Sequence, residues 1–125
     1  MIELKLPYPV SSNKYWRRSG RRMHRSAEAK NFIEEVKWIA KSKKAVPTKS
    51  HYSLNIKLHP KMNKDGSTNK TVVDIDNALK VTLDALEGVI YENDSQVKQI
   101  SIKYAEAVQG GGLTVIAERL FADEG

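Results

Sequence analysis

Apolar and polar residues alternate along four segments of the chain, which is the spacing of a β-strand with one buried face. The clearest is His51–His59, where every second residue is apolar and a proline follows. The others are Ile2–Leu6, residues 96–104 and residues 113–118, the last two joined around three consecutive glycines. Glycine-rich joints between apolar runs favour a turn. Four strands are therefore predicted.

A fifth segment repeats apolar residues at every third or fourth position, the spacing of an amphipathic helix. Phe32, Val36 and Ile39 share one face of this predicted helix, which spans residues 27–42. Ser26 precedes it and is the predicted N-cap, because a serine hydroxyl can accept a hydrogen bond from a free backbone amide of the first turn.

A second helix is predicted to begin near Asp76 and to end at Gly88, a residue type typical of helix C-termini. Its apolar face is predicted to carry Leu79, Leu83 and Leu86. Asp76 and two other charged residues that follow it at four-residue spacing would then lie on the opposite face.

The predicted order of elements is β, α, β, α, β, β. This order favours a small α+β domain in which two main helices pack on a mixed or antiparallel sheet. A chain of 125 residues can bury one hydrophobic core, so residues 1–125 are predicted to form a single domain. Residues 61–70 are polar and rich in turn-forming residues, and they are predicted to be a flexible loop.

The composition excludes some classes of protein. No apolar run approaches the roughly 18 residues of a membrane-spanning helix, so no membrane association is expected. The chain has no cysteine, and its first residues lack the pattern of a signal peptide, so a cytoplasmic location is expected. There is no glycine-rich phosphate loop, and no organic cofactor is predicted.

The positive charge is concentrated in residues 13–25, which are predicted to form a basic loop. The chain has 21 Lys and Arg residues against 15 Asp and Glu residues, a net charge of +6. Six of the cations lie in this segment, and no acid occurs between Glu3 and Glu28. Outside the segment the two signs balance. A basic cluster with aromatic residues among its cations is typical of a nucleic-acid-binding surface.

We therefore expect this segment to contact nucleic acid, with its cations on phosphates and its aromatic rings against unpaired bases. The expected contact residues are Lys14, Tyr15, Trp16, Arg17, Arg18, Arg21, Arg22 and Arg25. A solvated basic loop or a localisation signal would show a similar pattern. The lack of any acid among these cations favours the nucleic-acid interpretation.

Three aspartates, Asp74, Asp76 and Asp94, are candidates for a metal site. The first two lie at the start of the second predicted helix, and Asp94 precedes a strand that could return beside that start. Ordinary helix capping would also place acids there, because free backbone amides stabilise negative charge. On that structural interpretation Lys80 and Asp84, one turn apart, would form a surface salt bridge. The pattern alone leaves both interpretations open.

Carboxylate ligands suit Mg²⁺, with Mn²⁺ as a substitute, and they would leave coordination positions for phosphate oxygens. Zinc is not supported, because the chain lacks cysteine and its three histidines are scattered. A calcium-binding loop counted from Asp74 fails, because its sixth position is Leu79 and its twelfth is Ala85. On the metal-site interpretation, the protein would be a metal-dependent phosphodiesterase.

Four motifs, in order along the chain, resemble the RusA family of Holliday-junction resolvases. They are PVSSNKYWR, HRSAE, VDIDNALKVTLDAL and YENDSQV. The resemblance implies that Asp74, Asp76 and Asp94 are catalytic residues that bind Mg²⁺, and that Lys80 is needed for cleavage. It also adds Asn13 to the expected DNA contacts.

Two further positions fall within the matched motifs. Asp84 matches a family aspartate and is expected to have a structural or supporting role, while Asn93 stands where the family has a second aspartate beside Asp94.

The resemblance further implies a homodimer that resolves four-way DNA junctions by paired symmetric nicks. Such a crossover junction endodeoxyribonuclease would act in DNA recombination and repair, in the cytoplasm of a bacterial or phage-infected cell. Mg²⁺ would activate a water and neutralise charge on the scissile phosphate, and Lys80 would stabilise the transition state or orient the water. Two alternatives remain: a non-catalytic basic DNA-binding module, and a metal-dependent enzyme that uses the DxD pair to hold nucleotide diphosphates.

Overall fold

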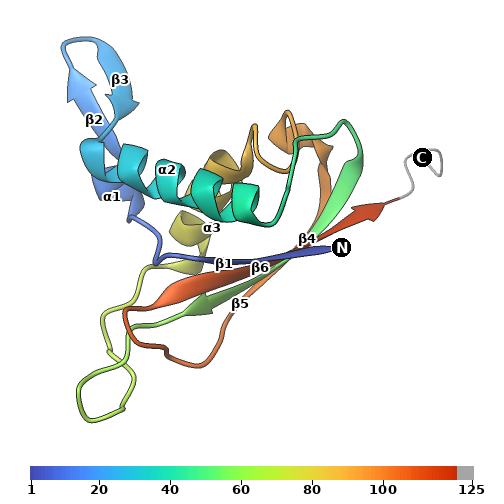
Figure 1. Ribbon diagram of the computed structural model, residues 1–125. Coiled ribbons are helices and arrows are strands. Elements are labelled where there is room, and N and C mark those ends of the chain that lie inside the picture. Colours follow the sequence, from blue (N-terminus) through green and yellow to red (C-terminus); the bar gives the residue numbers. More distant parts are fainter. Residues whose placement is uncertain (121–125) are drawn as a thin grey trace.

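The main sheet has four strands in the order β1-β6-β4-β5 in the computed structural model, which describes residues 1–120 (Figure 1). These strands are β1 (Ile2–Leu6), β4 (His51–His59), β5 (Val97–Tyr104) and β6 (Gly112–Leu120). β4 and β5 are parallel, whereas β6 is antiparallel to both β1 and β4. The predicted α+β fold with a mixed sheet is confirmed. The last five residues of the predicted domain lie outside the described part.

Two helices, α2 (Ala27–Ser42) and α3 (Ile75–Leu86), lie over one face of this sheet (Figure 1). α2 begins as predicted, because the Ser26 hydroxyl accepts a hydrogen bond from the Ala29 amide at 3.1 Å. The core between helices and sheet is apolar and takes alternate residues from the strands. Its strand members include Leu4, Leu6, Tyr52, Leu54, Ile56, Leu58, Leu113, Val115 and Ala117.

The buried face of α3 includes Leu86, as predicted, but otherwise differs from the predicted face. Leu79 and Leu83 are only partly buried. The buried residues of this helix are Ala78, Val81, Thr82, Ala85 and Leu86. These residues also recur at helical spacing, and the small ones among them let the helix backbone approach its neighbours closely. In α2, likewise, Ile39 is half-buried and the neighbouring Ala40 is buried instead.

The basic segment is not the loop that the sequence predicted. It forms a one-turn helix, α1 (Ser12–Tyr15), and a two-stranded hairpin, β2 (Trp16–Ser19) and β3 (Arg22–Arg25). Figure 1 shows this hairpin projecting from the N-terminal end of α2, away from the main sheet. Gly20 lies in the connecting turn with φ at +62°, a conformation that glycine adopts without strain. We call this hairpin the basic arm.

Residues 61–70 form the predicted loop after β4. A turn closes its tip, where the Asn63 amide donates to the Ser67 carbonyl at 2.8 Å and the Asp65 carboxylate accepts from the Ser67 hydroxyl at 2.6 Å. The flexibility of the loop stays a prediction. Across residues 1–120, no helix combines the length and the apolar character needed to span a membrane.

Candidate active site and nucleic-acid interface

Asp74 and Asp76 stand at the start of α3 with exposed side chains. Asp74 occupies the N-cap, and its backbone carbonyl accepts a hydrogen bond from the Ala78 amide at 2.9 Å. Its carboxylate, however, makes no capping hydrogen bond. Neither aspartate forms an ion pair with any residue in 1–120. Side-chain capping therefore does not explain Asp74, and both carboxylates are available to a ligand.

Asp94 is placed by a short 3-10 helix, η1 (Asp94–Gln96), which precedes β5. Asn93 caps this turn, because its side chain accepts a hydrogen bond from the Ser95 amide at 2.8 Å. The Gln96 side chain closes the reciprocal half of the capping box on the Asn93 amide at 2.9 Å. Gln96 also donates to the carbonyls of Thr48 and Ser50, at 2.8 and 2.7 Å. The loop that carries Asp94 is thus tied to the segment that leads into β4.

Asp94 shares a hollow of about 270 Å³ with residues from α3 and from the base of the basic arm. The lining residues are Tyr15, Trp16, Lys80, Val81, Leu83, Asp84 and Asp94. Lys80 is exposed and lies one helical turn beyond Asp76. The structure therefore brings together two of the four predicted catalytic residues, Lys80 and Asp94. Asp74 and Asp76 do not line this hollow.

The carboxylates fit a hard divalent cation by their chemistry, since oxygen ligands are what such ions prefer. Asp74 and Asp76 are exposed and two residues apart, which leaves their oxygens available. Among the residues of the described range, no three His, Asp or Glu side chains are close enough together to hold one metal ion. The predicted convergence of Asp94 on the other two is therefore not seen in this structure and stays a prediction.

Asp84 joins the basic arm to α3. Its carboxylate accepts two hydrogen bonds from the Arg25 guanidinium, from Nε and from an Nη, each at 3.0 Å, and a third from the Tyr15 hydroxyl. The Lys80–Asp84 salt bridge of the structural interpretation is not formed, because Arg25 pairs with this carboxylate instead. The Arg25 guanidinium also lies 5.7 Å from the centroid of the Trp16 ring, a cation-π distance. We call Tyr15, Arg25 and Asp84 the arm anchor.

The ionisation of these three groups reflects their contacts. Burial raises the pKa of the Tyr15 phenol above its ordinary value, and the neighbouring Asp84 carboxylate raises it further. Partial burial alone would raise the pKa of Asp84, but the hydrogen bonds from Arg25 and Tyr15 lower it below its usual range. The hydrogen bond to Asp84 raises the pKa of Arg25. At neutral pH the arm anchor therefore consists of a neutral Tyr15 phenol, an ionised Asp84 carboxylate and a charged Arg25 guanidinium.

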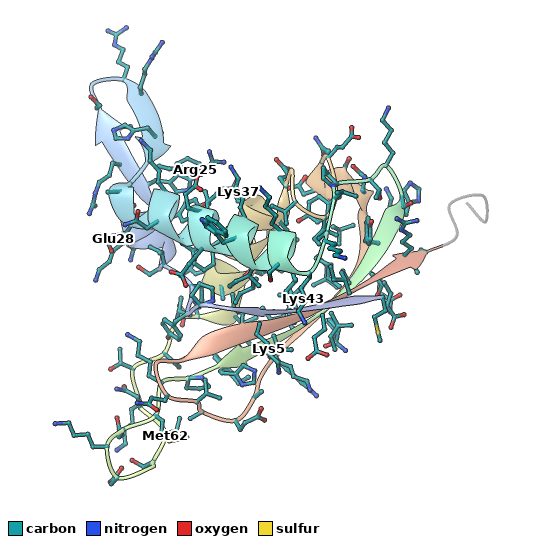
Figure 2. The ribbon with its side chains drawn as sticks, in the orientation of Figure 1. Lys5, Arg25, Glu28, Lys37, Lys43 and Met62 are labelled. Atoms are coloured by element: carbon teal, nitrogen blue, oxygen red, sulfur yellow. The ribbon has the colours of Figure 1, made fainter. Side chains whose placement is uncertain are left out.

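The expected DNA contacts divide into two groups. Arg17, Arg18, Arg21 and Arg22 are exposed on the basic arm, and Asn13 and Lys14 are exposed on α1. Figure 2 shows Arg25 at the base of the arm, where it meets α2. Tyr15 is only 1% exposed, so it offers no ring face to a base, and Arg25 is already paired with Asp84. Trp16 keeps 40% of its surface exposed beside the hollow.

Sequence reasoning missed the role of Gln96, and it expected a structural or supporting role for Asp84 without identifying its partners. Gln96 could have been found, because Asn93 followed three residues later by glutamine is the capping-box spacing. No local pattern could have found the partners of Asp84, because Arg25 and Tyr15 lie 59 and 69 residues away in the chain.

Two comparisons with known proteins identify the family of this chain. The family model described as Endodeoxyribonuclease RusA matches residues 7–116. A crossover junction endodeoxyribonuclease rusA of Enterobacteria phage HK97 is 33% identical over 112 residues, covering 88% of this chain and 88% of that protein. A nuclease is thus favoured over the non-catalytic binding module and over the enzyme acting on nucleotide diphosphates. The chain belongs to the RusA family of endodeoxyribonucleases.

Proposed function

We propose that this enzyme resolves four-way DNA junctions by paired symmetric nicks, in DNA recombination and repair. The observation that carries the proposal is the placement of the candidate catalytic residues and of the residue that anchors the basic arm on one helix, α3. This helix bears Asp74, Asp76 and Lys80 on exposed positions, and one turn beyond Lys80 it bears Asp84, which holds the basic arm. A substrate gripped by the arm would therefore lie beside the candidate catalytic groups. The phage HK97 relative is named as an enzyme of crossover junctions, which supports this substrate.

Membership in the family implies a divalent metal ion, and we infer Mg²⁺, with Mn²⁺ as a substitute. Asp74, Asp76 and Asp94 would hold it, because they match the metal-binding carboxylates that the family resemblance implies, and all three are exposed. When bound, the ion supplies an activated water and neutralises charge on the phosphate.

Lys80 contributes a cation of the protein's own. It lies in the hollow with Asp94 and forms no ion pair within residues 1–120, so its ammonium is available to a phosphate oxygen. In the transition state of hydrolysis the phosphate carries extra negative charge, which a positioned cation stabilises.

The basic arm and α1 hold the arms of the junction in this proposal. Among the described residues, the four exposed arginines of the arm form one ion pair, between Arg17 and Glu28. It spans 3.8 Å, and both side chains are exposed. Such a pair contributes little in water, so it would yield to a phosphate at small cost. Guanidinium groups also match the geometry of phosphate oxygens.

A homodimer suits this substrate, because a two-fold axis relates two identical cuts most simply. We therefore expect light scattering to give twice the 14.1 kDa mass of one chain. A strict monomer at micromolar concentration that still cuts both strands together would contradict the paired-site arrangement.

A nicking assay tests the proposed function. The protein is incubated with a mobile four-way junction and with a linear duplex of the same sequence, each with and without Mg²⁺. We expect nicks at symmetric positions on two strands of the junction, only with Mg²⁺. Equal cutting of the linear duplex, or no dependence on a divalent metal, would overturn the proposal. The site would then serve a different substrate or a different chemistry.

A further inference from the structure

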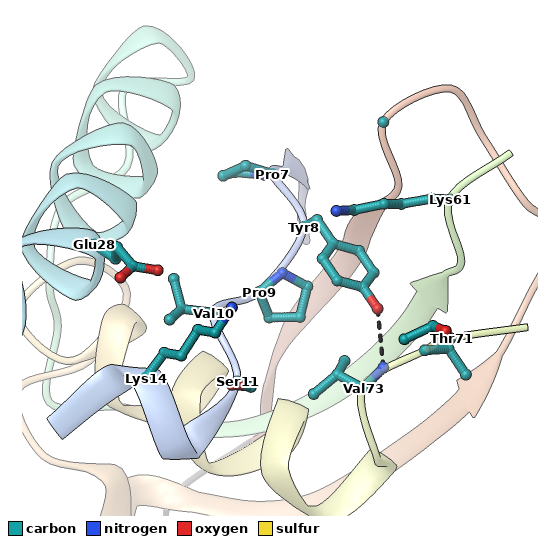
Figure 3. A pocket seen from close by; sticks show the side chains of 12 residues that line it. Pro7, Tyr8, Pro9, Val10, Ser11, Lys14, Glu28, Lys61, Thr71 and Val73 are labelled. Atoms are coloured by element: carbon teal, nitrogen blue, oxygen red, sulfur yellow. Dashed lines mark hydrogen bonds between the residues drawn. The ribbon is translucent and has the colours of Figure 1, made fainter. Parts of the chain in front are cut away.

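A second, larger hollow lies next to the start of α3. Except for Lys14 and Glu28, its lining residues have no part in the roles above. Its volume is about 660 Å³, within the range of roughly 300–1,000 Å³ that small-molecule sites occupy. One side is the segment after β1, from Pro7 to Ser11, and the other is the segment from Thr71 to Val73 (Figure 3). Asp74 follows directly in the chain. The hollow is therefore one residue away from a candidate catalytic carboxylate.

Tyr8 forms a fixed wall of this hollow. Its hydroxyl accepts a hydrogen bond from the Val73 amide at 2.9 Å, which Figure 3 shows as a dashed line. The Lys61 ammonium lies 5.0 Å from the centroid of the ring. Gly111 backs the ring with φ at +69°, and a Cβ there would clash with the ring atoms. Three different segments thus hold the ring in place, and one of them carries Asp74.

The lining combines apolar surface with two lysines and one acid, Glu28 of α2. Pro9, Val10, Val72 and Val73 give apolar walls beside the Tyr8 ring, and Lys14 and Lys61 bring positive charge. Figure 3 shows the side chains of Lys14 and Lys61 on opposite sides of the Tyr8 and Pro9 segment. A nucleobase has flat apolar faces and is joined to a phosphate, so one unpaired nucleotide matches both features. Stacking on an aromatic ring and contact with lysine are the usual means of holding single-stranded DNA.

We propose that this hollow, which we call the Tyr8 hollow, binds one unpaired nucleotide of the cleaved strand, beside the phosphate that is cut. The proposal rests on the proposed function, since it takes a DNA junction as the substrate. The base lies against the apolar walls, and Lys61 contacts an adjacent phosphate. Because the Tyr8 hydroxyl holds the Val73 amide, an occupied hollow also fixes the backbone that leads into Asp74. The branch point is the natural source of the nucleotide, because extruding a base costs least where it is already unpaired.

The experiment is an abasic scan of the junction in the absence of divalent metal, so that binding is measured without cleavage. Each nucleotide around the branch point is replaced in turn by an abasic sugar, and the affinity of the full-length protein is measured. In each of the two cleaved strands we expect one position at which the abasic sugar weakens binding about tenfold. This is the scale of one base stacked on an aromatic side chain. Affinity at the other positions should stay within twofold.

Three variants connect that position to the Tyr8 hollow. Val10→Trp places a larger side chain in the hollow. This variant should bind the intact junction as weakly as the parent protein binds the junction with the abasic sugar. The abasic sugar should not weaken its binding further. Lys61→Ala should lower the slope of log affinity against log salt by about 0.9, the value for one neutralised phosphate. Lys64→Ala is the matched control, because Lys64 is exposed in the same loop but does not line the hollow, and it should leave the slope unchanged.

The proposal is overturned if no abasic position weakens binding by more than twofold, or if Val10→Trp, shown by its melting curve to be folded, retains the full abasic penalty. Failure here is distinct from failure of the proposed function. If the protein nicks junctions in Mg²⁺ but shows no abasic effect, the proposed function stands and the proposed role of the Tyr8 hollow is wrong. A protein that shows the abasic effect but does not nick loses the proposed function instead.

Discussion

The two ends of α3 carry the same kind of side chain in opposite circumstances. At its start, Asp74 and Asp76 are exposed and have no ion-pair partner within the described residues. Two turns further on, the side chain of Asp84 is 25% exposed and accepts three hydrogen bonds from Arg25 and Tyr15. A carboxylate that keeps its oxygens unpaired can bind a ligand, whereas a carboxylate that is saturated holds the protein together. Aspartates on one helix therefore differ in their surroundings, and we expect the exposed ones to act in catalysis and Asp84 to act in structure.

The largest expected effect comes from removing the charge of the three candidate metal ligands, two at the start of α3 and one in η1. Asp74→Asn, Asp76→Asn and Asp94→Asn should each fold normally and lose junction nicking by orders of magnitude, because an amide keeps the shape but binds a hard cation poorly. Binding of the junction without metal should be as tight as in the parent or tighter, since a carboxylate beside a phosphate repels it. Single-turnover nicking in Mg²⁺ and metal-free binding are the measurements.

Near-parent nicking rates for all three asparagine variants would contradict a catalytic role. Lys80→Ala sharpens the distinction, because it should also abolish cutting but should weaken binding or leave it unchanged. It removes a cation rather than an anion.

The next effect concerns the arm anchor. Arg25→Met keeps the length of the side chain but leaves the partly buried Asp84 carboxylate with fewer donors, which should cost about 1–3 kcal/mol of the free energy of unfolding. Tyr15→Phe removes only a hydroxyl and should cost about 0.5–1.5 kcal/mol. Urea unfolding measures both. The double variant should cost less than the sum of the two, because both residues act on one carboxylate. Strict additivity would mean that the anchor does not act as a unit.

The exposed end of the arm should affect DNA binding without affecting stability. Replacement of Arg17, Arg18, Arg21 and Arg22 by Ala should flatten the salt dependence of junction binding, by about 0.9 in the log-log slope for each phosphate that the variant no longer neutralises. A control with the same change of charge replaces Lys41, Lys43, Lys44 and Lys49, which lie exposed at and beyond the opposite end of α2. A slope unchanged by the arginine variant, or lowered equally by the control, would remove the arm from the DNA interface.

The smallest effect is on the pH dependence of stability. The hydrogen bonds of the anchor hold the pKa of Asp84 below its ordinary value, although partial burial opposes them. The unfolded chain therefore binds the proton more readily, and the stabilisation is present above about pH 4 and lost as pH falls through the folded-state pKa. The stability gap between the parent and Asp84→Asn should shrink as urea unfolding is moved from pH 7 to pH 3. A gap that is constant with pH would mean that Asp84 is not ionised in the anchor.

The sequence predicted the main sheet and both long helices, because the signals are local. Alternation marks β4, and the serine at the N-cap marks the start of α2. The basic arm was missed because all eight of its strand residues are exposed, so no apolar alternation exists to reveal strands. The face of α3 was misjudged because the small residues that pack against the core carry a weaker apolar signal than the leucines beside them.

The candidate site was predicted in part. The pattern of acids proposed Asp74, Asp76 and Asp94, and the family resemblance added Lys80. The structure brings Lys80 and Asp94 to one hollow and places Asp74 and Asp76 at the start of α3, while their role in catalysis stays a prediction. The sequence could not predict that Asp84 anchors the arm, since that depends on contacts between segments about half the chain apart. The Tyr8 hollow depends likewise on the meeting of the segment after β1 with the one before α3.

One kinetic comparison tests most directly whether Asp76 acts in catalysis and Asp84 in anchoring the basic arm. Asp76→Asn and Asp84→Asn remove the same charge from the same helix, and each is assayed for junction affinity and for the nicking rate at saturating protein in Mg²⁺. We predict that Asp76→Asn keeps the parent's affinity and loses the rate by orders of magnitude. Asp84→Asn should bind more weakly and yet recover a rate within about tenfold of the parent once saturated. The contrary result is that both variants keep the parent's affinity and lose the nicking rate at saturating protein to the same extent. The two aspartates would then have the same role, and the separation of catalysis from arm anchoring would be wrong.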